Sequence, residues 1–331
     1  MSVEAFALPL ATPLETAAGR IEEREGFLFA ARGGTGEATP LPGWTESLAA
    51  CERALRDADE KERWSAALAA CEGAPAARHA VSQACLDARA RAADRPLYRE
   101  LGGERECERV PVNATVGDAD VEGTLSAVET AVHAGFETVK VKVGARAVAA
   151  DADRLDAVRS AYPRLELRAD ANAAWDEAEA RAFLDATSGL DLAYVEQPVP
   201  GVDALARLTS VGPVAADESV VDAGVDACLD AGVAAVVLKP MALGGLDRAR
   251  DAAFAALDAG VTPVVSNTVD AAYARSGAVH LAASLPDPAP AGLATGGRFA
   301  RDLVPDATPV RNGYIAVPRG NGHAIGGSAG E

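Results

Sequence analysis

Lysine is nearly absent from this chain. Only four of its 31 basic residues are lysines, and the remaining 31 − 4 = 27 are arginines. Acidic residues number 49, which gives a formal net charge of −18. Such an acidic, lysine-poor composition is typical of adaptation to high salt, and it argues against nucleic acid or an anionic membrane surface as a partner. Because lysine, unlike arginine, can lose its proton when buried, the remaining lysines are candidates for chemistry. They are Lys61, Lys140, Lys142 and Lys239.

Long apolar runs and paired cysteines are missing as well. No run reaches the ~18 apolar residues that indicate a membrane span, and the N-terminal residues lack the basic flank and apolar stretch of a signal peptide. The cysteines are odd in number and form no C-x-x-C pair, which argues against a disulfide framework or a zinc site. We expect buried structural thiols in a cytoplasmic protein. The cysteines are Cys51, Cys71, Cys85, Cys107 and Cys228.

A strand–helix rhythm begins near residue 108. Short runs rich in β-branched residues alternate with stretches long enough for a crossover helix, which indicates a parallel sheet. Eight such runs favour a closed (β/α) barrel. An open doubly wound sheet would require a glycine-rich dinucleotide turn after its first strand, and NATVGDADVEG contains none. The runs are 110–116, 138–143, 165–172, 192–198, 214–219, 234–240, 262–268 and 290–295.

The first 107 residues follow a different pattern, with two strand-like pieces, a Pro/Gly-rich turn and then helical stretches. We therefore predict an α+β capping domain over 1–107 and a (β/α) barrel carrying the catalytic residues over 108–300. The tail, 301–331, is expected to pack partly on the cap and to end in disorder. The expected cap helices are 46–58, 60–71 and 78–92.

Two of the lysines lie in the second run. Lys140 and Lys142 are two residues apart in the pattern V-K-V-K-V, so on a strand both point to one face and the valines to the other. Solvated lysines on an edge strand are the plain alternative. In so lysine-poor a chain, we expect both to enter the barrel mouth, where barrel active sites lie. Two ammonium groups held close together repel, and this lowers the pKa of one member of such a pair toward that of a general base.

Carboxylates end the next three runs. Asp170, Glu196 and Asp217 are separated by 196 − 170 = 26 and 217 − 196 = 21 residues. Three inward carboxylates would repel one another unless a cation neutralised them. Oxygen ligands suit a hard divalent ion, Mg²⁺ above all, with Mn²⁺ as a substitute. Helix N-capping is the alternative for the two aspartates, but glutamate is not a natural cap, so the set of three predicts a metal site.

Lys239 ends the sixth run in the sequence VVLKP. A lone lysine at this place can also be a Schiff-base nucleophile, as in aldolases, and this remains the alternative from a different enzyme class. The adjacent carboxylates favour another chemistry. A divalent ion would hold a substrate carboxylate, a lysine on one side would remove the proton α to it, and the ion would stabilise the resulting enediolate.

The motifs KVK, DAN, EQP, DES and LKP, on five successive strands, resemble the enolase superfamily. The lysine pair resembles its muconate lactonizing enzyme subgroup, because the strand-7 histidine of the mandelate racemase subgroup is missing from TPVVSNT. Several stretches also resemble the o-succinylbenzoate synthase family. They are GEATPLPGWTES, VNATVGDAD, LRADANAAW, KPMALGGLDR and GLATG. The resemblance covers essentially the whole chain, with 1–107 as the capping domain.

This resemblance implies a lyase of menaquinone biosynthesis. It would dehydrate a small dicarboxylate, 2-succinyl-6-hydroxy-2,4-cyclohexadiene-1-carboxylate, to 2-succinylbenzoate. Asp170, Glu196 and Asp217 would bind Mg²⁺, and Asn172 and Glu218 would orient ligands or water around it.

The resemblance also implies roles for the cations. Lys142 would abstract the α-proton and then help to expel the hydroxyl group on the same face, and Lys140 beside it would favour its basic form. Lys239 would stabilise the anionic intermediate from the opposite side, and Arg168 would add local positive charge. A loop over 19–26 would close over the site from the cap. The expected substrate contacts are Ser266, Asn267, Gly244, Arg20 and Arg24.

One stretch departs from the family pattern. The strand-7 sequence is SNTVD where the family has S-S-S-x-E, which places Asn267, Thr268 and Asp270 at altered positions. The nearest rival is an N-succinylamino acid racemase, or another racemase or cycloisomerase of the subgroup, with Lys142 and Lys239 as paired bases. A dipeptide epimerase would carry D-x-D at the end of strand 8, and GLATG has no acid. An inactive barrel would have no reason to keep this set of lysines and carboxylates.

Overall fold

The computed structural model describes residues 2–16, 19–305 and 308–325. Its N-terminal part is a three-stranded antiparallel sheet, in the order β1-β2-β3, packed against helix α3. A buried apolar cluster that includes Phe27, Phe29 and Leu55 holds this capping unit together. Its elements are β1 (Ser2–Thr16), β2 (Gly19–Ala31), β3 (Gly34–Ala38), α1 (Leu48–Asp59), α2 (Trp64–Ala70), α3 (Pro75–Ala92) and α4 (Leu97–Glu100).

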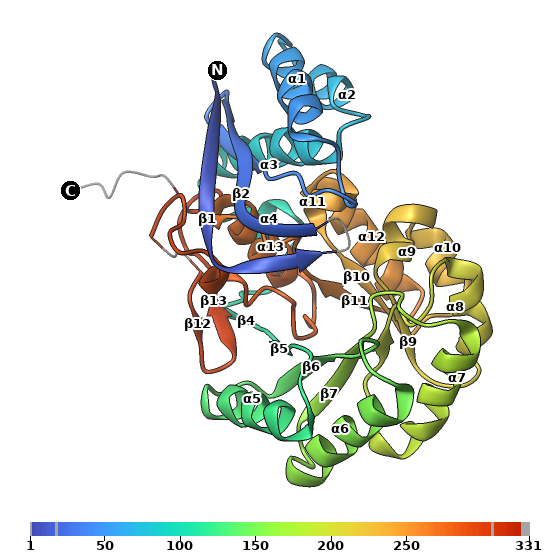
Figure 1. Cartoon of the computed structure of the whole chain (residues 1–331). Helices are drawn as coiled ribbons and strands as arrows, with labels where there is room; N and C mark the ends of the chain where they lie inside the picture. The colour runs from blue at the N-terminus through green and yellow to red at the C-terminus, as the bar shows by residue number, and fades with distance from the viewer. Residues whose placement is uncertain (1, 17–18, 306–307, 326–331) are drawn as a thin grey trace.

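The segment predicted as a loop over 19–26 is instead the first half of strand β2, so that expectation is wrong. Strand β2 pairs with β1, and the register shifts between Pro9 and Leu14. The hairpin bends along its length (Figure 1). From β2, Arg24 donates to the carbonyl of Val269 in the loop after β11 (Thr262–Val265), the strand that pairs with β10 (Ala235–Leu238). The segment does lie at the barrel mouth, but as paired strand.

Seven parallel strands form the second sheet, in the order β11-β10-β9-β8-β7-β6-β5. The sheet curls, and single bridges Val112–Ala291 and Ser266–Gly292 connect its two ends. The eighth predicted strand is therefore reduced to two bridges, because Pro288 and Pro290 lack the N–H groups that a ladder requires. The remaining strands are β5 (Ala114–Val116), β6 (Thr138–Lys142), β7 (Glu166–Asp170), β8 (Val195–Glu196) and β9 (Val214–Ala216).

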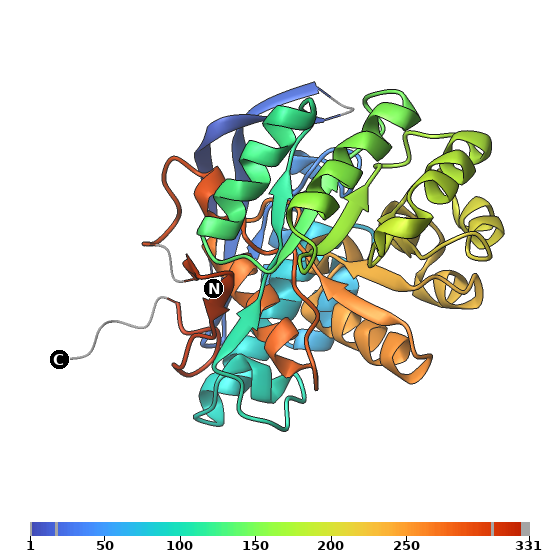
Figure 2. The ribbon, with the colours of Figure 1, turned by 90° about the horizontal axis from the view of Figure 1, so that it is seen from below.

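Strand register brings the predicted site residues level. Lys142 lies opposite Asp170, and Asp170 lies opposite Glu196. Val139 and Val141, on the other face of β6, are fully buried in the main core. Helices cover the outside of the strands, as the view from below shows (Figure 2). They are α5 (Val121–His133), α6 (Val148–Ala161), α7 (Glu177–Ala186), α8 (Val202–Leu208), α9 (Glu218–Ala223), α10 (Val225–Asp230), α11 (Pro240–Leu243), α12 (Leu246–Asp258) and α13 (Ala272–Ser284).

The C-terminal part returns to both units. Strands β12 (Val310–Arg311) and β13 (Tyr314–Ala316) form a small antiparallel sheet with β4 (Arg109–Pro111). Further on, the backbone N–H of His323 donates to Asp87 of cap helix α3 at 2.9 Å. The disorder predicted for the chain end concerns 326–331, which lie outside the described residues.

Two smaller observations complete the fold. Among the residues that the structure describes, none of the helices combines the length and the apolar character required to cross a membrane. All five cysteines are free thiols. Cys51, Cys71 and Cys228 are buried as expected, but Cys85 and Cys107 are partly exposed, so the expectation of burial is wrong for these two.

Candidate active site

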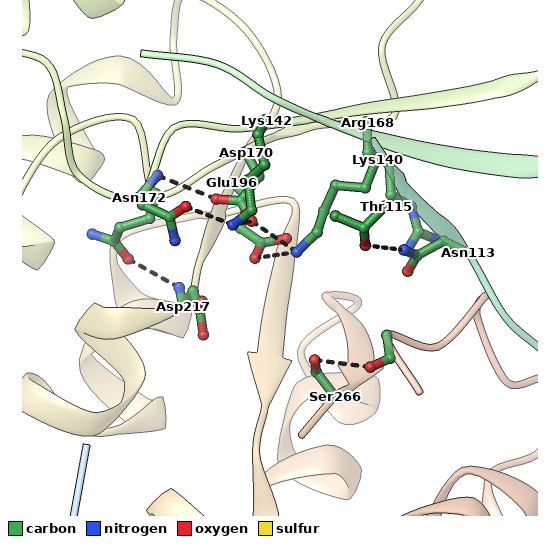
Figure 3. Close-up of polar contacts among 12 residues, drawn as sticks. Asn113, Thr115, Lys140, Lys142, Arg168, Asp170, Asn172, Glu196, Asp217 and Ser266 are labelled. Atoms are coloured by element: carbon green, nitrogen blue, oxygen red, sulfur yellow. Dashed lines mark hydrogen bonds and ion pairs between the residues drawn. The ribbon is translucent and has the colours of Figure 1, made fainter. Parts of the chain in front are cut away.

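Both lysines of strand β6 reach one carboxylate. Lys140 and Lys142 lie 2.8 and 2.7 Å from the same oxygen, Oδ2 of Asp170 (Figure 3). Lys140 also donates to Glu196 at 2.7 Å, and Lys142 donates to Asn172 at 2.5 Å. The alternation of the strand thus places both ammonium groups inside the barrel, next to the carboxylates of the following two strands.

The third carboxylate, Asp217, is held by residues that follow strands β8 and β10. Lys239, directly after β10, donates to Asp217 at 2.6 Å. The buried side chain of Gln197 accepts the backbone N–H groups of Asp217 and Ser219 at 2.9 and 3.1 Å. Gln197, which the sequence reasoning did not single out, therefore fixes the turn that presents Asp217. Its only sequence signal was its place beside Glu196 in the EQP motif.

Helix capping does not account for the two aspartates. Asp217 precedes α9 but makes no side-chain capping bond. Helix α7 is capped by Asp176. The backbone N–H that Asp170 accepts belongs to Asn172, in the turn after β7 and not in the helix. The N-cap alternative thus explains neither side chain, and the inward position of both carboxylates calls for another role.

The turns after β7 and β8 have strained backbone. Asn172, Ala173 and Gln197 have φ angles of 46°, 57° and 36°, in the left-handed region. Asparagine tolerates this region, but it is costly for alanine and glutamine. The backbone N–H of Ala173 donates to the carbonyl of Gln197 at 2.7 Å, so each turn holds the other in this shape. Such strain is commonly retained where it places functional side chains.

Charges inside the barrel alternate. Burial by itself raises the pKa of Asp170, but the ammonium groups of Lys140 and Lys142 outweigh it and hold this pKa well below its usual range. Burial and the charge of Asp170 raise the pKa of Glu196, and the ammonium group of Lys140 opposes this rise. Burial likewise lowers the pKa of Lys140, but Asp170 and Glu196 overcome it and raise that pKa well above its ordinary value. Lys140 is therefore a permanent cation in this arrangement.

A divalent ion fits the donor chemistry of this cluster. Asp170, Glu196 and Asp217 are all at most 2% exposed, and Oδ1 of Asp217 has no hydrogen-bond partner. A buried carboxylate oxygen without a partner is costly, and a hard cation would satisfy it. Nevertheless, within the described ranges no three His, Cys, Asp or Glu side chains are close enough to hold one ion as they stand. The ammonium groups of Lys140, Lys142 and Lys239 pair with these carboxylates, so a divalent ion would have to compete with the lysines for them.

Two more predicted residues lie beside the cluster. Asn172 donates to Glu218 at 3.3 Å, which joins the ends of strands β7 and β9. Burial, followed by the charge of Asp217, raises the pKa of Glu218. Oε2 of Glu218 is also buried without a hydrogen-bond partner. Both residues are thus placed where they can orient ligands or water.

Ser266 and Asn267, at the end of β11, face the segment that closes the barrel. The hydroxyl of Ser266 lies 3.4 Å from the Gly292 carbonyl, and Asn267 donates to Thr295 at 2.8 Å. Gly244 does not join them. Its carbonyl accepts Arg78 of cap helix α3 at 2.6 Å, so it lies in the junction between α3 and the barrel, and its contact with substrate stays a prediction.

Arg20 and Arg24, both on β2, have different surroundings. They line a pocket of about 790 Å³ between the hairpin and residues 40–48, and every residue of that lining belongs to the cap. The side chain of Arg20 is 59% exposed and pairs with Glu22 at 3.2 Å. Arg24 is 2% exposed and donates to the carbonyls of Thr39, Pro40 and Val269 at 2.8, 3.0 and 3.2 Å. Arg24 therefore links the cap to the loop after β11.

Arg168 lies inside the barrel, level with Lys140. It is two residues before Asp170 on β7, so it points to the same face one layer further from the mouth. Its guanidinium donates to Glu166 and to the Pro290 carbonyl at 2.8 and 2.7 Å, and it stacks over the ring of Tyr194 at 5.0 Å. These contacts hold its guanidinium in the barrel interior, and its role as a source of local positive charge stays a prediction.

Trp44 is a second residue that the sequence reasoning did not single out. Its ring lies over Lys239, with the Nζ atom 3.6 Å from the ring centroid. The PLPGW stretch was a family motif, but nothing in it indicated which barrel residue the tryptophan meets. A capping-domain side chain thus contacts one of the two lysines predicted to act on the substrate.

Comparison with known proteins agrees with this geometry. A family profile described as "Enolase C-terminal domain-like" matches residues 124–327. The N-succinylamino acid racemase of Thermus thermophilus is 31% identical over 96% of this chain and 91% of its own length. The o-succinylbenzoate synthase of Thermobifida fusca is 38% identical over 64% of this chain and 68% of its own. A solved dipeptide epimerase from Enterococcus faecalis, complexed with Mg and L-Leu-L-Tyr, superposes with TM-score 0.85 and 26% identity over 98% of both chains.

A capping sheet over a curled parallel sheet, with lysines and carboxylates at the strand ends, defines a class of barrel enzymes. The chain belongs to the enolase superfamily. Its homologues include o-succinylbenzoate synthases and N-succinylamino acid racemases.

Proposed function

We propose that the chain is a metal-dependent lyase that dehydrates 2-succinyl-6-hydroxy-2,4-cyclohexadiene-1-carboxylate to 2-succinylbenzoate. The observation that carries this proposal is the row of alternating charges across strands β6 to β10. Lys142 pairs with Asp170 at one end of the row, and Lys239 pairs with Asp217 at the other. A lysine thus stands at each end of a set of carboxylates suited to a divalent ion. The relative from Thermobifida fusca supports this choice among the reactions of the superfamily.

Asp170, Glu196 and Asp217 would hold the ion, which we infer to be Mg²⁺. When bound, it neutralises the carboxylates and makes the α-proton of a carboxylate substrate more acidic. We assign Lys142 as the base of the strand-β6 pair because a substrate can reach it: its side chain is 35% exposed, whereas that of Lys140 is 13% exposed and pairs with both Asp170 and Glu196. Its Nζ atom takes the α-proton and returns a proton to the departing hydroxyl group, which leaves as water. Lys140 stays charged and lies beside the substrate carboxylate.

Racemisation of N-succinylamino acids is the second candidate. The relative from Thermus thermophilus, which matches over nearly the whole chain, favours it. In this reaction Lys142 would remove the proton from one face and Lys239 would return one to the other. A Schiff-base aldolase is not proposed, because Lys239 is paired with Asp217 in a row of carboxylates that Schiff-base chemistry does not need.

The first experiment follows aromatic product by ultraviolet absorbance, at high salt, with Mg²⁺ and then with EDTA. We expect metal-dependent product formation that falls by about 10²- to 10⁴-fold in Lys142→Ala, the range for loss of a general base. Lys61→Ala, which changes a lysine of the cap, is the matched control and should keep full activity. No product, together with α-proton exchange of an N-succinylamino acid in D₂O, would replace the lyase proposal by the racemase. Neither product nor exchange would reject the lysine–metal mechanism.

A further inference from the structure

The ammonium group of Lys239 is held from two sides. The carboxylate of Asp217 lies 2.6 Å away on the barrel side, and the ring of Trp44 covers it on the cap side at 3.6 Å. Only 12% of the lysine side chain is exposed. The negative face of an indole ring attracts a cation, and the attraction grows when water is excluded. Lys239 thus has one interaction partner in each domain, a carboxylate in the barrel and an aromatic ring in the cap.

The loop that carries Trp44 is fixed on its N-terminal side. Arg24 donates to the carbonyl of Pro40 at 3.0 Å and anchors the start of the loop. The turn itself is closed, because the N–H of Trp44 donates to the Leu41 carbonyl at 3.0 Å and the N–H of Leu41 donates to the Thr45 hydroxyl at 2.8 Å. These contacts limit the positions that the ring can take.

The loop is fixed on its C-terminal side as well. The carboxylate of Glu46 accepts the N–H groups of Ala76 and Ala77 at 3.0 and 2.9 Å, in the first turn of α3. A carboxylate bonded to the N-terminus of a long helix is well held, because it satisfies donors that have no partner within the helix. Trp44 therefore lies between two anchors and is presented to the barrel as a rigid group.

We propose that Trp44 is a positioning residue for Lys239. Lysine has a flexible four-carbon stem, and one ion pair leaves several rotamers open to it. The Trp44 ring selects one of them, and it does so only while the cap is docked on the barrel. The capping domain would therefore take part in catalysis through the placement of a barrel lysine, in addition to any contact with substrate. The inference deepens the proposed function, since it rests on Lys239 acting on the substrate.

The contact itself is tested by fluorescence, which requires no substrate. An ammonium group against an indole ring quenches its emission by proton transfer to the excited ring. Emission is measured with Mg²⁺ present for wild type, Lys239→Met, Trp44→Phe and the double variant. We expect Lys239→Met to raise emission in the wild-type background and to leave it unchanged in the Trp44→Phe background. An equal change in both backgrounds, or none in either, would overturn the contact.

The catalytic consequence is tested by kinetics. Trp44→Leu should lower kcat by about 3- to 30-fold, the range that one cation–π contact supplies, with KM nearly unchanged. Trp44→Phe keeps an aromatic face and should recover part of the loss. In a Lys239→Met background, Trp44→Leu should cause no further loss, because its effect passes through the lysine. A rise in KM alone would instead make Trp44 a wall of the substrate pocket and overturn the positioning role.

Trp64 is the matched control. It is a second tryptophan of the cap, and it also stacks on a cation, Arg32, at 4.8 Å. Trp64→Leu should leave kcat at the wild-type value, and a loss equal to that of Trp44→Leu would mean that general weakening of the cap is the cause. If wild type neither dehydrates nor exchanges the α-proton, the proposed function fails, and the fluorescence comparison alone then decides the inference.

Discussion

Lys142 and Asp170 form an ion pair of 2.7 Å, in which the expected base is bonded to an expected metal ligand. Lys140 shares the same carboxylate oxygen. A divalent ion would compete with both lysines for Asp170, and so metal binding and release of the base are coupled. Three of the four lysines in the chain lie in this one cluster, and no arginine ion-pairs with its three carboxylates among the described residues.

Metal binding should be visible in thermal stability as well as in activity. A ligand that binds only the folded state at ~100 times its Kd adds about 2.7 kcal/mol to the free energy of unfolding. We expect Mg²⁺ to raise the Tm of wild type and to have little effect on Asp217→Asn, which loses the unpartnered carboxylate oxygen. Asp226→Asn, an exposed change on α10, is the control and should respond like wild type. An equal rise in Asp217→Asn would place the ion elsewhere.

Glu37 should make stability depend on pH. Burial raises its pKa from 4.5 to about 7 in the folded protein, with a further contribution from Asp270. The folded state then binds the proton more tightly than the unfolded state. The contribution of this proton binding to the free energy of unfolding is complete below about pH 4.5 and is lost as the pH rises to about 7. Urea unfolding at several pH values should show a smaller decline over this window in Glu37→Gln than in wild type.

The control for this prediction is Glu23→Gln, an exposed change on β2 that should keep the wild-type slope. The comparison between variants is needed because buried His280, whose pKa burial lowers from 6.5 to about 3, acts in the opposite direction. Identical slopes in wild type and Glu37→Gln would mean that Glu37 does not titrate in this range.

Substitution of Arg24 should lower stability, whereas substitution of Arg20 should affect substrate binding and not stability. Arg24→Met leaves the carbonyls of Thr39 and Pro40 without their buried donor, so we expect a loss of about 2–4 kcal/mol in the free energy of unfolding. Arg20→Met changes an exposed residue and should alter stability by less than about 0.5 kcal/mol. If Arg20 contacts substrate, as the family resemblance implies, this variant raises KM instead. A stable Arg24→Met protein with a raised KM would restore Arg24 as a substrate contact.

Salt should stabilise the protein. At a net charge of −18, self-repulsion opposes the compact state, and raising the ionic strength from ~0.1 to ~1 M shortens the screening length from ~10 to ~3 Å. We expect Tm to rise with KCl over this range. Sorbitol at equal osmolality is the comparison: it stabilises proteins by exclusion from their surface without screening charge, so only the rise in Tm beyond that in sorbitol is assigned to screening. A Tm that falls with KCl would contradict the high-salt interpretation of the composition.

The strand-end chemistry could be predicted because it depends on short-range rules. Side chains two apart on a strand share a face, and this put Lys140 and Lys142 together without any knowledge of the fold. Parallel strands end at the same side of a sheet, which grouped the three carboxylates. Each of these rules acts within a strand or between neighbouring strands.

The features that the sequence did not predict are contacts between distant segments. Gly244 accepts a hydrogen bond from Arg78, 166 residues away in sequence. The segment 19–26 was expected as a loop, but its pairing with β1 makes it a strand. No local sequence pattern predicts which distant segment a glycine or an arginine will contact.

The sequence by itself determined the alternation of strands and helices, the inward lysines and the carboxylates that follow them, because hydrophobic periodicity and strand direction encode these features locally. Only the tertiary structure decided that Arg24 joins the cap to the loop after β11 and that Trp44 covers Lys239. Residues 44 and 239 belong to different domains, and their contact results from the docking of two separately formed surfaces, which no periodicity in the chain records.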